Sequence, residues 1–305
     1  MVQIMQKRKI KKYRKRDYMG LVYIAPWLLG FLLLQLYPFV SSFIYSFTDY
    51  KFFNEPSFVG LKNYIRLFKL DPEFWGSLKV TLLYTVITVP GKLTMALFIA
   101  TLLNRNVKGI GAIRTIYYLP SLFGGSVAVA ILWKILFMSD GAINNILSSI
   151  HLPTVQWLGN GKSAVVTICM LEIWQFGSSM VMFLAALKQV PASLYEAASL
   201  DGAGSVKKFF SITLPQITPI IFFNLIMQTI TALQNFTSAF VVTGGGPNKA
   251  TYVLGMKLYT DAFGYYKMVY ACATSWVIFA MVMVVTLLLF RFSSGKIYYE
   301  DGGDF

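Results

Sequence analysis

The sequence predicts an all-α integral membrane protein with six transmembrane helices. Hydrophobic residues make up 56% of the 305 residues and charged residues only 13%, whereas a soluble domain carries about 25% charged residues. The mean hydropathy of +0.59 is too high for a protein with a fully hydrated surface. Apolar segments also recur at about the 20 residues that a helix needs to cross a membrane, at residues 19–48, 77–104, 114–138, 164–187, 212–243 and 267–292.

The first apolar segment follows a strongly basic amino terminus. Residues 1–18 contain eight basic residues and one acid, Asp17. Such a run suits a nucleic-acid arm, a nuclear signal or the inner flank of a membrane helix, and the 30 uncharged residues from Met19 to Thr48 favour the last. A cleavable signal is not indicated, because its apolar core is about 7–15 residues long. We therefore predict a cytoplasmic tail at 1–18, followed by a membrane domain at 19–292.

The distribution of basic residues predicts the orientation. With six spans, both termini lie on one side of the membrane, together with the loops at about 104–114 and 188–211. The loops and tails on that side hold 16 Lys and Arg, and the opposite loops hold nine. Cytoplasmic loops carry the excess of basic residues, so we expect both termini, including a tail at 293–305, in the cytoplasm.

The outer loops are too short for a separate domain, which needs about 50 residues or more. The first outer loop spans residues 49–76. Its apolar residues Leu61, Tyr64, Ile65 and Phe68 recur at helical spacing, which predicts a helix at the membrane interface.

The third outer loop follows Thr243. Three glycines and a proline exclude a helix at its start, at Gly244, Gly245, Gly246 and Pro247.

The stretch from Tyr195 to Pro219 is dense in Ala and Gly and lies between two apolar segments. Ser193 and Glu196 form an S-x-x-E pattern, which predicts a capping box and a helix beginning near Leu194. Gly202 can adopt the left-handed conformation that ends a helix, Ser205 can cap a second helix, and Pro215 would end or kink it. We expect a helix–turn–helix elbow whose small side chains let another backbone approach closely.

This elbow resembles the EAA loop of ABC-importer permeases. The resemblance rests on Glu196-Ala197-Ala198, then Asp201-Gly202-Ala203, then Phe209, Leu214-Pro215 and Pro219. In that family the loop is cytoplasmic and docks into a groove on an ATPase subunit. The resemblance therefore implies that residues at about 191–219 couple the chain to an ATPase, with docking through Glu196, Ala197, Ala198, Asp201, Gly202 and Ala203.

Other stretches are similar to the carbohydrate-uptake branch of the same family, so that the likeness runs from about residue 20 to 292. They include FVGLKNY at 58–64 and TGGGPNKAT at 243–251. The resemblance implies a MetI-like fold and an assembly with a second permease subunit, two ABC ATPase subunits and an external solute-binding protein. It also implies a sugar or oligosaccharide substrate, a bacterial or archaeal cytoplasmic membrane, and a binding-protein-facing surface at Gly244 to Pro247.

Polar residues follow one helix face in three predicted spans. Thr81, Thr85, Thr88 and Lys92 recur at helical spacing in the second span, and similar sets lie in the fourth and fifth. Because polar residues are costly in hydrocarbon, these faces predict a shared hydrated interior. The candidates for a solute path are Tyr84, Thr88, Lys92, Glu172, Trp174, Gln175, Asn224, Gln228, Thr231 and Asn235.

The same polar faces have a second interpretation. Their side chains can bond neighbouring helices instead of a solute, at about 0.6 kcal/mol each. Lys92 and Glu172 are the charges well inside the spans. An unpaired charge there costs at least about 2.5 kcal/mol, which favours a mutual ion pair, although Lys92 can instead extend toward an interface.

Two other classes of function find little support. His151 has no Cys or His nearby, so no metal site is expected, and Glu172 is alone in its span, which argues against an intramembrane enzyme.

Cys169 and Cys272 are expected to be free thiols inside apolar segments. No P-loop motif occurs, so ATP and Mg would be bound by partner ATPase subunits and no cofactor by this chain. The alternatives are a permease for another polar solute, such as glycerol phosphate, and a stand-alone carrier or channel.

Overall fold

The computed structural model describes residues 19–50, 56–105 and 108–293. The predicted tails at 1–18 and 293–305 lie outside the described residues, apart from Ser293, which ends the last helix. The described part of the chain is almost wholly helical, with one isolated β-bridge between Thr48 and Phe58. This confirms the all-α prediction.

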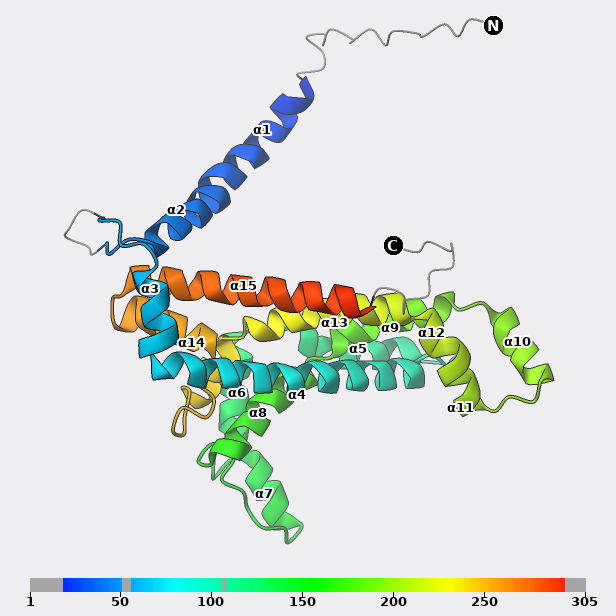
Figure 1. Ribbon diagram of the computed structural model, residues 1–305. Helices are drawn as coiled ribbons and strands as arrows, with labels where there is room; N and C mark the ends of the chain where they lie inside the picture. The colour runs from blue at the N-terminus through cyan, green and yellow to red at the C-terminus, as the bar shows by residue number, and fades with distance from the viewer. Residues whose placement is uncertain (1–18, 51–55, 106–107, 294–305) are drawn as a thin grey trace, which may run out of the picture.

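The first span is a rod that extends away from the rest of the molecule (Figure 1). It consists of α1 (Met19–Phe31), the π-helical turn η2 (Leu32–Leu36) and α2 (Tyr37–Ser46). Only its α2 end packs on the body, where Phe39 and Phe43 lie 4.7 and 4.6 Å from the ring of Trp276. The rest of this rod exposes apolar side chains on all sides.

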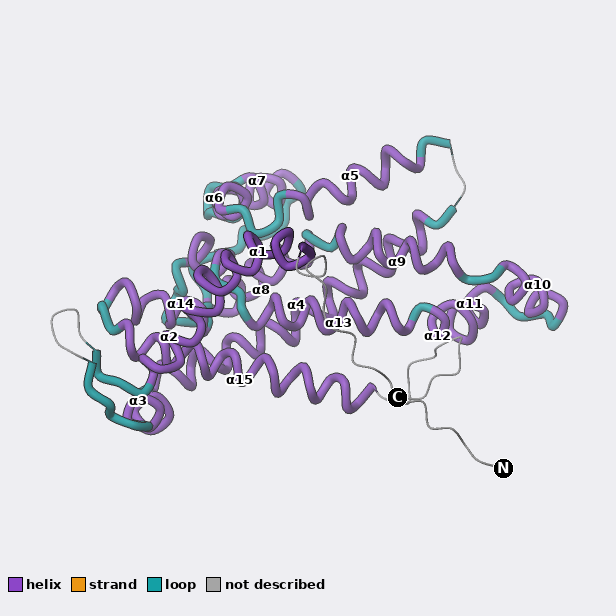
Figure 2. Tube along the Cα trace, turned by 90° about the horizontal axis from the view of Figure 1, so that it is seen from above, coloured by secondary structure: helices purple, strands orange, loops and turns teal. Residues whose placement is uncertain are grey.

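The body is organised around α4 (Pro72–Leu103), the longest helix. Asp71 caps it, accepting hydrogen bonds from the backbone of Glu73 and Phe74 at 3.0 and 3.3 Å. On its buried polar face, Thr85 and Thr88 each donate to the carbonyl four residues earlier and so need no partner outside the helix. The helices α8 (Gly161–Trp174), α9 (Gly177–Gln189) and α13 (Thr218–Leu233) pack against it, and α15 (Met268–Ser293) packs against α13 and α2 (Figures 1 and 2).

The six predicted spans correspond to three straight helices and three bent pairs of helices. Three described helices are long and apolar enough to span a membrane, and the count reaches six when each of three bent pairs is taken as one span. The predicted span 114–138 consists of α5 (Ile110–Leu122) and α6 (Val127–Leu136), which meet at 101°. The spans at 164–187 and 212–243 bend by 44° and 67°. Each break falls at a proline or glycine, where the helix loses a hydrogen bond or gains backbone freedom.

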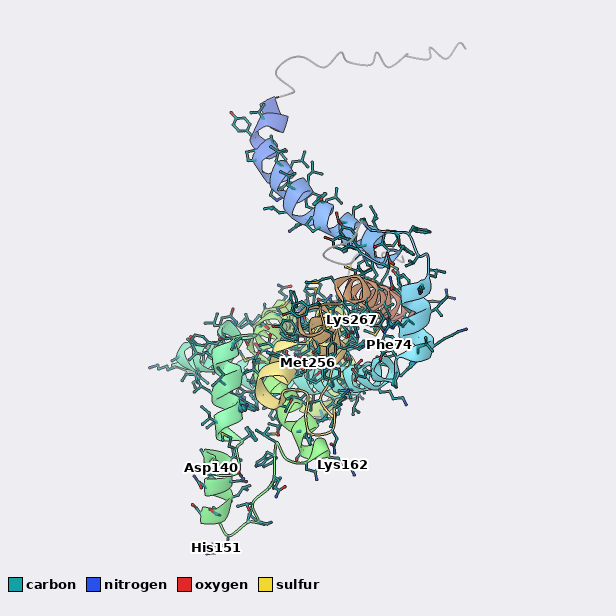
Figure 3. The ribbon with its side chains drawn as sticks, turned by 90° about the vertical axis from the view of Figure 1, so that its left-hand side faces the viewer. Phe74, Asp140, His151, Lys162, Met256 and Lys267 are labelled. Atoms are coloured by element: carbon teal, nitrogen blue, oxygen red, sulfur yellow. The ribbon has the colours of Figure 1, made fainter. Side chains whose placement is uncertain are left out.

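The remaining helices are short. Toward the amino terminus they are α3 (Lys62–Ile65), the π-helical turn η3 (Arg66–Leu70), and α7 (Ala142–Ser149), which lies on an arm with His151 near its tip (Figure 3). The others are α10 (Ala192–Leu200), α11 (Ser205–Lys208), η4 (Phe209–Thr213), α12 (Leu214–Gln216), η5 (Ala239–Thr243), α14 (Leu254–Tyr259) and η6 (Thr260–Gly264).

The predicted elbow is present, but its caps differ from the prediction. The helix α10 begins at Ala192, directly after Pro191, and its cap makes no side-chain hydrogen bond. Ser193 is therefore already inside the first turn, and the predicted capping box is wrong. The predicted cap at Ser205 is also wrong, since Ser205 is the first residue of α11 and Gly204 precedes it as the cap. Gly202 has a φ of 72°, which confirms the left-handed stop.

A buried charged cluster stabilises the end of the molecule that lies opposite to the elbow. Lys257, 2% exposed, binds Asp71 at 2.6 Å and Asp261 at 2.9 Å. The Tyr270 hydroxyl donates to the same Asp71 oxygen at 2.5 Å. Asp71 thus caps α4 and at the same time ties it to α14 and α15.

The cluster shifts the titration of its members. Burial alone would raise the pKa of Asp71, but hydrogen bonds from Lys257 and Tyr270 outweigh it and hold the pKa below the ordinary value of 3.8. Burial likewise opposes charge on Lys257, but hydrogen bonds to Asp71 and Asp261 raise its pKa. Both groups are therefore charged at neutral pH.

This predicts a specific loss of stability for Asp71→Asn. Asn caps a helix as well as Asp, so the change removes the ion pair and keeps the cap. Breaking a buried pair costs about 3 kcal/mol or more, and because Lys257 keeps Asp261 we expect a loss of about 3 kcal/mol, seen as a lower melting temperature in detergent.

The pH dependence provides a second check. The pKa of Asp71 is depressed in the folded state, so its contribution is present above pH 3.8 and is lost as the pH falls below it. The difference in stability between wild type and Asp71→Asn should therefore shrink only as the pH falls below 3.8. Asp140→Asn, at an exposed position, is the control, and an equal loss in that variant would contradict the role of the cluster.

Candidate functional site

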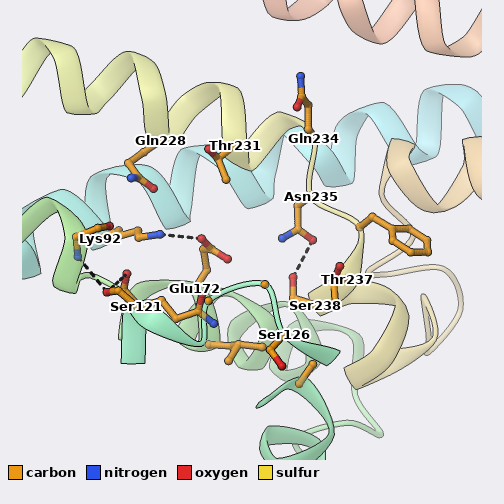
Figure 4. Close-up of a pocket in the computed structure, with 17 residues that line it drawn as sticks. Lys92, Ser121, Ser126, Glu172, Gln228, Thr231, Gln234, Asn235, Thr237 and Ser238 are labelled. Atoms are coloured by element: carbon orange, nitrogen blue, oxygen red, sulfur yellow. Dashed lines mark hydrogen bonds and ion pairs between the residues drawn. The ribbon is translucent and has the colours of Figure 1, made fainter. Parts of the chain in front are cut away.

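A polar cavity of about 520 Å³ lies beside the middle of α4 (Figure 4). Its walls come from α4, the α5–α6 break, the α8–α9 break and the end of α13. Serine, threonine, amide and glycine residues dominate the lining, which consists of Lys92, Ser121, Gly124, Gly125, Ser126, Ala130, Leu171, Glu172, Gln175, Ser178, Gln228, Thr231, Gln234, Asn235, Phe236, Thr237 and Ser238.

The charged centre of the cavity is an ion pair between two helices. Lys92 of α4 reaches Glu172 of α8 with an Nζ to Oε1 distance of 2.8 Å (Figure 4). Both side chains are largely buried, 8% and 16% exposed. The mutual pairing predicted from the sequence is confirmed, and it neutralises two charges that would each be costly alone.

A chain of hydrogen bonds extends from this pair. The hydroxyl of Tyr84 donates to the second oxygen of Glu172 at 3.5 Å and accepts from the Asn235 amide at 2.9 Å. Ser238 in turn donates to the Asn235 carbonyl at 2.7 Å. Tyr84 and Asn235 are therefore held by protein partners.

The helix breaks bring backbone close to backbone in the cavity wall. A Cβ on Gly177 would lie 2.7 Å from the Tyr117 carbonyl and 2.5 Å from the Ser121 hydroxyl. Ser121 donates to the Gln175 carbonyl at 3.3 Å and accepts from the Ser178 N–H at 3.0 Å. This hydroxyl thus bonds two backbone groups at the α8–α9 break, which a straight helix would have satisfied internally.

Most of the predicted path residues meet in this cavity. Lys92, Glu172, Gln175, Gln228, Thr231 and Asn235 line it. Their contact with a solute stays a prediction.

Four of the predicted residues do not line it. Tyr84 is buried behind the cavity, Thr88 donates to the Tyr84 carbonyl, and Asn224 donates to the Ile220 carbonyl. Trp174 is 40% exposed and packs 5.5 Å from the ring of Trp133. The helix α8 ends at Trp174, and the bend that follows leaves this side chain away from the cavity.

Sequence reasoning missed the part of the wall that comes from the breaks. These residues are Ser121, Gly124, Gly125, Ser126, Ser178, Gln234, Thr237 and Ser238. The signal was present as a run of Pro, Ser and Gly at 120–126, inside a segment that is otherwise apolar.

The elbow forms an exposed site at the end of the molecule opposite to α3 and α14 (Figures 1 and 2). Glu196, Ala197 and Asp201 are exposed. The side chain of Leu200 is 91% exposed, and Val206 and Phe210 are 71% and 62% exposed, which the sequence interpretation did not single out.

Internal hydrogen bonds hold the elbow in shape. Lys208 donates to the Ser199 hydroxyl at 2.6 Å, and Tyr195 and Thr213 share a bond of 2.8 Å. Its apolar surface is therefore presented by a fixed scaffold.

The glycine loop lies at the other end of the molecule and is not helical at its start, as predicted. Gly244 and Gly245 have φ angles of 61° and 83°. Thr251 closes the loop by donating to the Gly246 carbonyl at 2.9 Å. Gly244 is exposed, Gly246 and Pro247 are half-buried, and Gly245 is buried, so Gly244 and its neighbours beyond Pro247 form the accessible part.

The free cysteines are as expected. Cys169 is buried and Cys272 half-buried, and neither forms a disulfide. No group of acids, cysteines and histidine that could hold a metal occurs among the residues the structure describes.

The fold and these sites define a polytopic helical membrane protein with a polar intramembrane cavity and a protruding elbow. The family described as "binding-protein-dependent transport system inner membrane component" matches residues 92–294. The chain is 46% identical to the probable ABC transporter permease protein YesP of Bacillus subtilis, over 96% of both chains. It is 34% identical to the trehalose/maltose transport system permease protein MalF of Thermococcus litoralis, over 93% of this chain and 96% of that protein.

The structure also resembles a chain of a solved bacterial alginate ABC transporter in complex with an alginate-bound periplasmic protein. The TM-score is 0.79 and the identity 24%, over 92% of this chain and 95% of the other. That likeness supports the fold. The chain belongs to the family of inner membrane components of binding-protein-dependent transport systems, which are the permease subunits of ABC transporters, and it has the MetI-like fold.

The ion pair predicts non-additive effects of mutation. Lys92→Met and Glu172→Gln should each lower the melting temperature of the purified protein in detergent, because each leaves an uncompensated buried charge. The double variant removes both charges, so its loss should be smaller than the sum of the two single losses. Additive losses would show that the two side chains do not interact.

Proposed function

We propose that the chain is the transmembrane permease subunit of an ATP-driven ABC importer that moves a sugar or oligosaccharide into the cytoplasm. The observation that carries the proposal is the polar cavity beside α4, whose lining of amides and hydroxyls matches the hydrogen-bonding groups of a saccharide. The named saccharide substrates of the trehalose/maltose relative support the substrate class.

The chain is proposed to act without an ATPase site or cofactor of its own. Two ABC ATPase subunits would bind ATP and Mg, a second permease subunit would complete the membrane part, and an external solute-binding protein would deliver the saccharide. The membership of a binding-protein-dependent family supports this set of partners.

The elbow is proposed to dock on the ATPase from the cytoplasmic side, with both termini on the same side. Its exposed apolar residues, Leu200 above all, suit a groove that is buried on assembly. The bound elbow connects directly to the cavity, because α9 ends at Gln189 just before it and α13 begins at Thr218 just after it. Closure of the ATPase would pull both helices and change the access to Gln228 and Thr231.

The docking role predicts that Gly202→Asp uncouples transport. No atom lies within 4 Å of a Cβ at Gly202, and Asp tolerates the left-handed conformation better than most residues. The variant should fold and assemble, but should lose most of the ATPase activity that saccharide-loaded binding protein stimulates.

The matched control is Gly109→Asp. Gly109 also has a positive φ, 81°, and no atom within 4 Å of a Cβ, but it lies outside the elbow. Full stimulation in Gly202→Asp would contradict the coupling role, and loss of expression in Gly202→Asp alone would point to a purely structural glycine.

Leu200→Asp tests the docking surface separately. Leu200 makes little contact within the chain, so the variant should keep the melting temperature of wild type. Burying a charge in a hydrophobic interface is unfavourable, so the ATPase should copurify in much lower yield. An unchanged yield would place Leu200 outside the interface.

A further inference from the structure

The helix formed by α3 and η3, residues 62–70, has three distinct faces. Asn63, Tyr64 and Leu67 face the protein and are half-buried or buried. Leu61, Ile65 and Phe68 recur at helical spacing and are 60%, 51% and 42% exposed. The third face is basic and consists of the residues that follow each of these apolar ones. They are also exposed, and they are Lys62, Arg66 and Lys69.

The helix runs across the direction of the membrane spans. It is seen from the side in Figures 1 and 3 and end-on in Figure 2, whereas α4 and α15 run lengthwise in Figures 1 and 2. A helix perpendicular to the spans lies parallel to the membrane plane.

Hydrogen bonds fix the helix at the level where two spans end. The Asn63 amide donates to the carbonyls of Ser46 and Thr48, each at 2.9 Å, and the Tyr64 hydroxyl bonds Ser46 at 2.8 Å. Ser46 is the last residue of the first span. On the other side Trp75, near the start of α4, donates to the Phe68 carbonyl at 2.9 Å, and Trp is typical of the membrane–water boundary.

We propose that residues 61–70 form an interfacial anchor that binds anionic phospholipids. Leu61, Ile65 and Phe68 enter the boundary of the acyl chains, and Lys62, Arg66 and Lys69 contact the phosphate groups above them. None of these three basic side chains takes part in an ion pair with another described residue. The guanidinium carbon of Arg66 lies 5.7 Å from the centre of the Tyr270 ring. The proposal goes beyond the transport function and does not depend on the solute.

A lipid surface fits both exposed faces at once. A basic face beside an apolar face, on a helix held at the boundary, is the pattern of helices that lie in the headgroup region. A protein partner that covered only the basic face would leave the apolar face without a partner. We therefore infer that the membrane covers both faces.

The depth of the helix is tested with a fluorescent label on the full chain in liposomes. Cys169→Ala and Cys272→Ala remove the native thiols, and Ile65→Cys introduces the labelling site. Asn248→Cys, at an exposed position in the glycine loop, is the control. Spin-labelled lipid should quench the label at 65 and iodide in the water should not, with the reverse at 248.

Strong iodide quenching at both positions would overturn the proposal. Protection of position 65 that appears only when the external binding protein is added would also overturn it, since it would identify a protein as the occupant.

The headgroup preference is tested with two matched pairs of substitutions. Lys62→Gln with Lys69→Gln removes two basic groups from the anchor, and Lys134→Gln with Lys162→Gln removes two exposed ones elsewhere. The readout is the ratio of phosphatidylglycerol to phosphatidylcholine retained by the purified chain in native mass spectrometry.

The anchor pair should lower that ratio by roughly fivefold for each lysine, and the loss should shrink at high salt. The control pair should leave it nearly unchanged. An equal fall in both pairs, or in neither, would contradict a lipid site at residues 61–70.

Discussion

The ion pair between Lys92 and Glu172 determines how the centre of this protein can be built. In hydrocarbon either charge is costly alone, so α4 and α8 must lie close enough for Lys92 Nζ to reach Glu172 Oε1, at 2.8 Å. Tyr84 and Asn235 extend the same network to the end of α13. The polar groups at the centre of the cavity are therefore paired and carry no net charge. Any one of them left unpaired would destabilise the membrane domain.

Breaks in the helices form much of the wall of the cavity around this network. A straight apolar helix presents side chains to a cavity but no backbone, because its N–H and C=O groups bond one another. The breaks after Leu122 and Trp174 and the irregular backbone after Leu233 line the cavity, and the Ser121 hydroxyl bonds two backbone groups at the break after Trp174. Irregular backbone is stable at membrane depth only where protein or a hydrated cavity covers it.

The sequence predicted those features that depend on local chemistry or on the cost of charge. Charge burial predicted the Lys92–Glu172 pair, and the steric limits of glycine and proline predicted the turn at Gly202 and the irregular loop from Gly244. Hydropathy located the spans but did not show the breaks, because Pro120 and Gly124 lie in a segment that remains apolar on average. The aromatic ring of Trp174 suggested stacking on a sugar, but residue type does not show which way a side chain points, and this ring packs against Trp133 instead. The capping box at Ser193 is wrong because α10 begins at Ala192, two residues before the predicted start near Leu194.

If the cavity is the passage of an ATP-driven importer, water must reach it from each side of the membrane in turn. Thr231 lines the cavity, whereas Met227, on the same helix α13, is 46% exposed and is not among the lining residues. Cysteines placed at each position, in a background without Cys169 and Cys272, would be treated with a membrane-impermeant thiol reagent in the assembled transporter. Position 231 should react from one side of the membrane without ATP and from the other side when the ATPase is trapped closed, while position 227 should stay unreactive. Reaction of position 231 from the same side in both states, or equal reaction at 227, would contradict it.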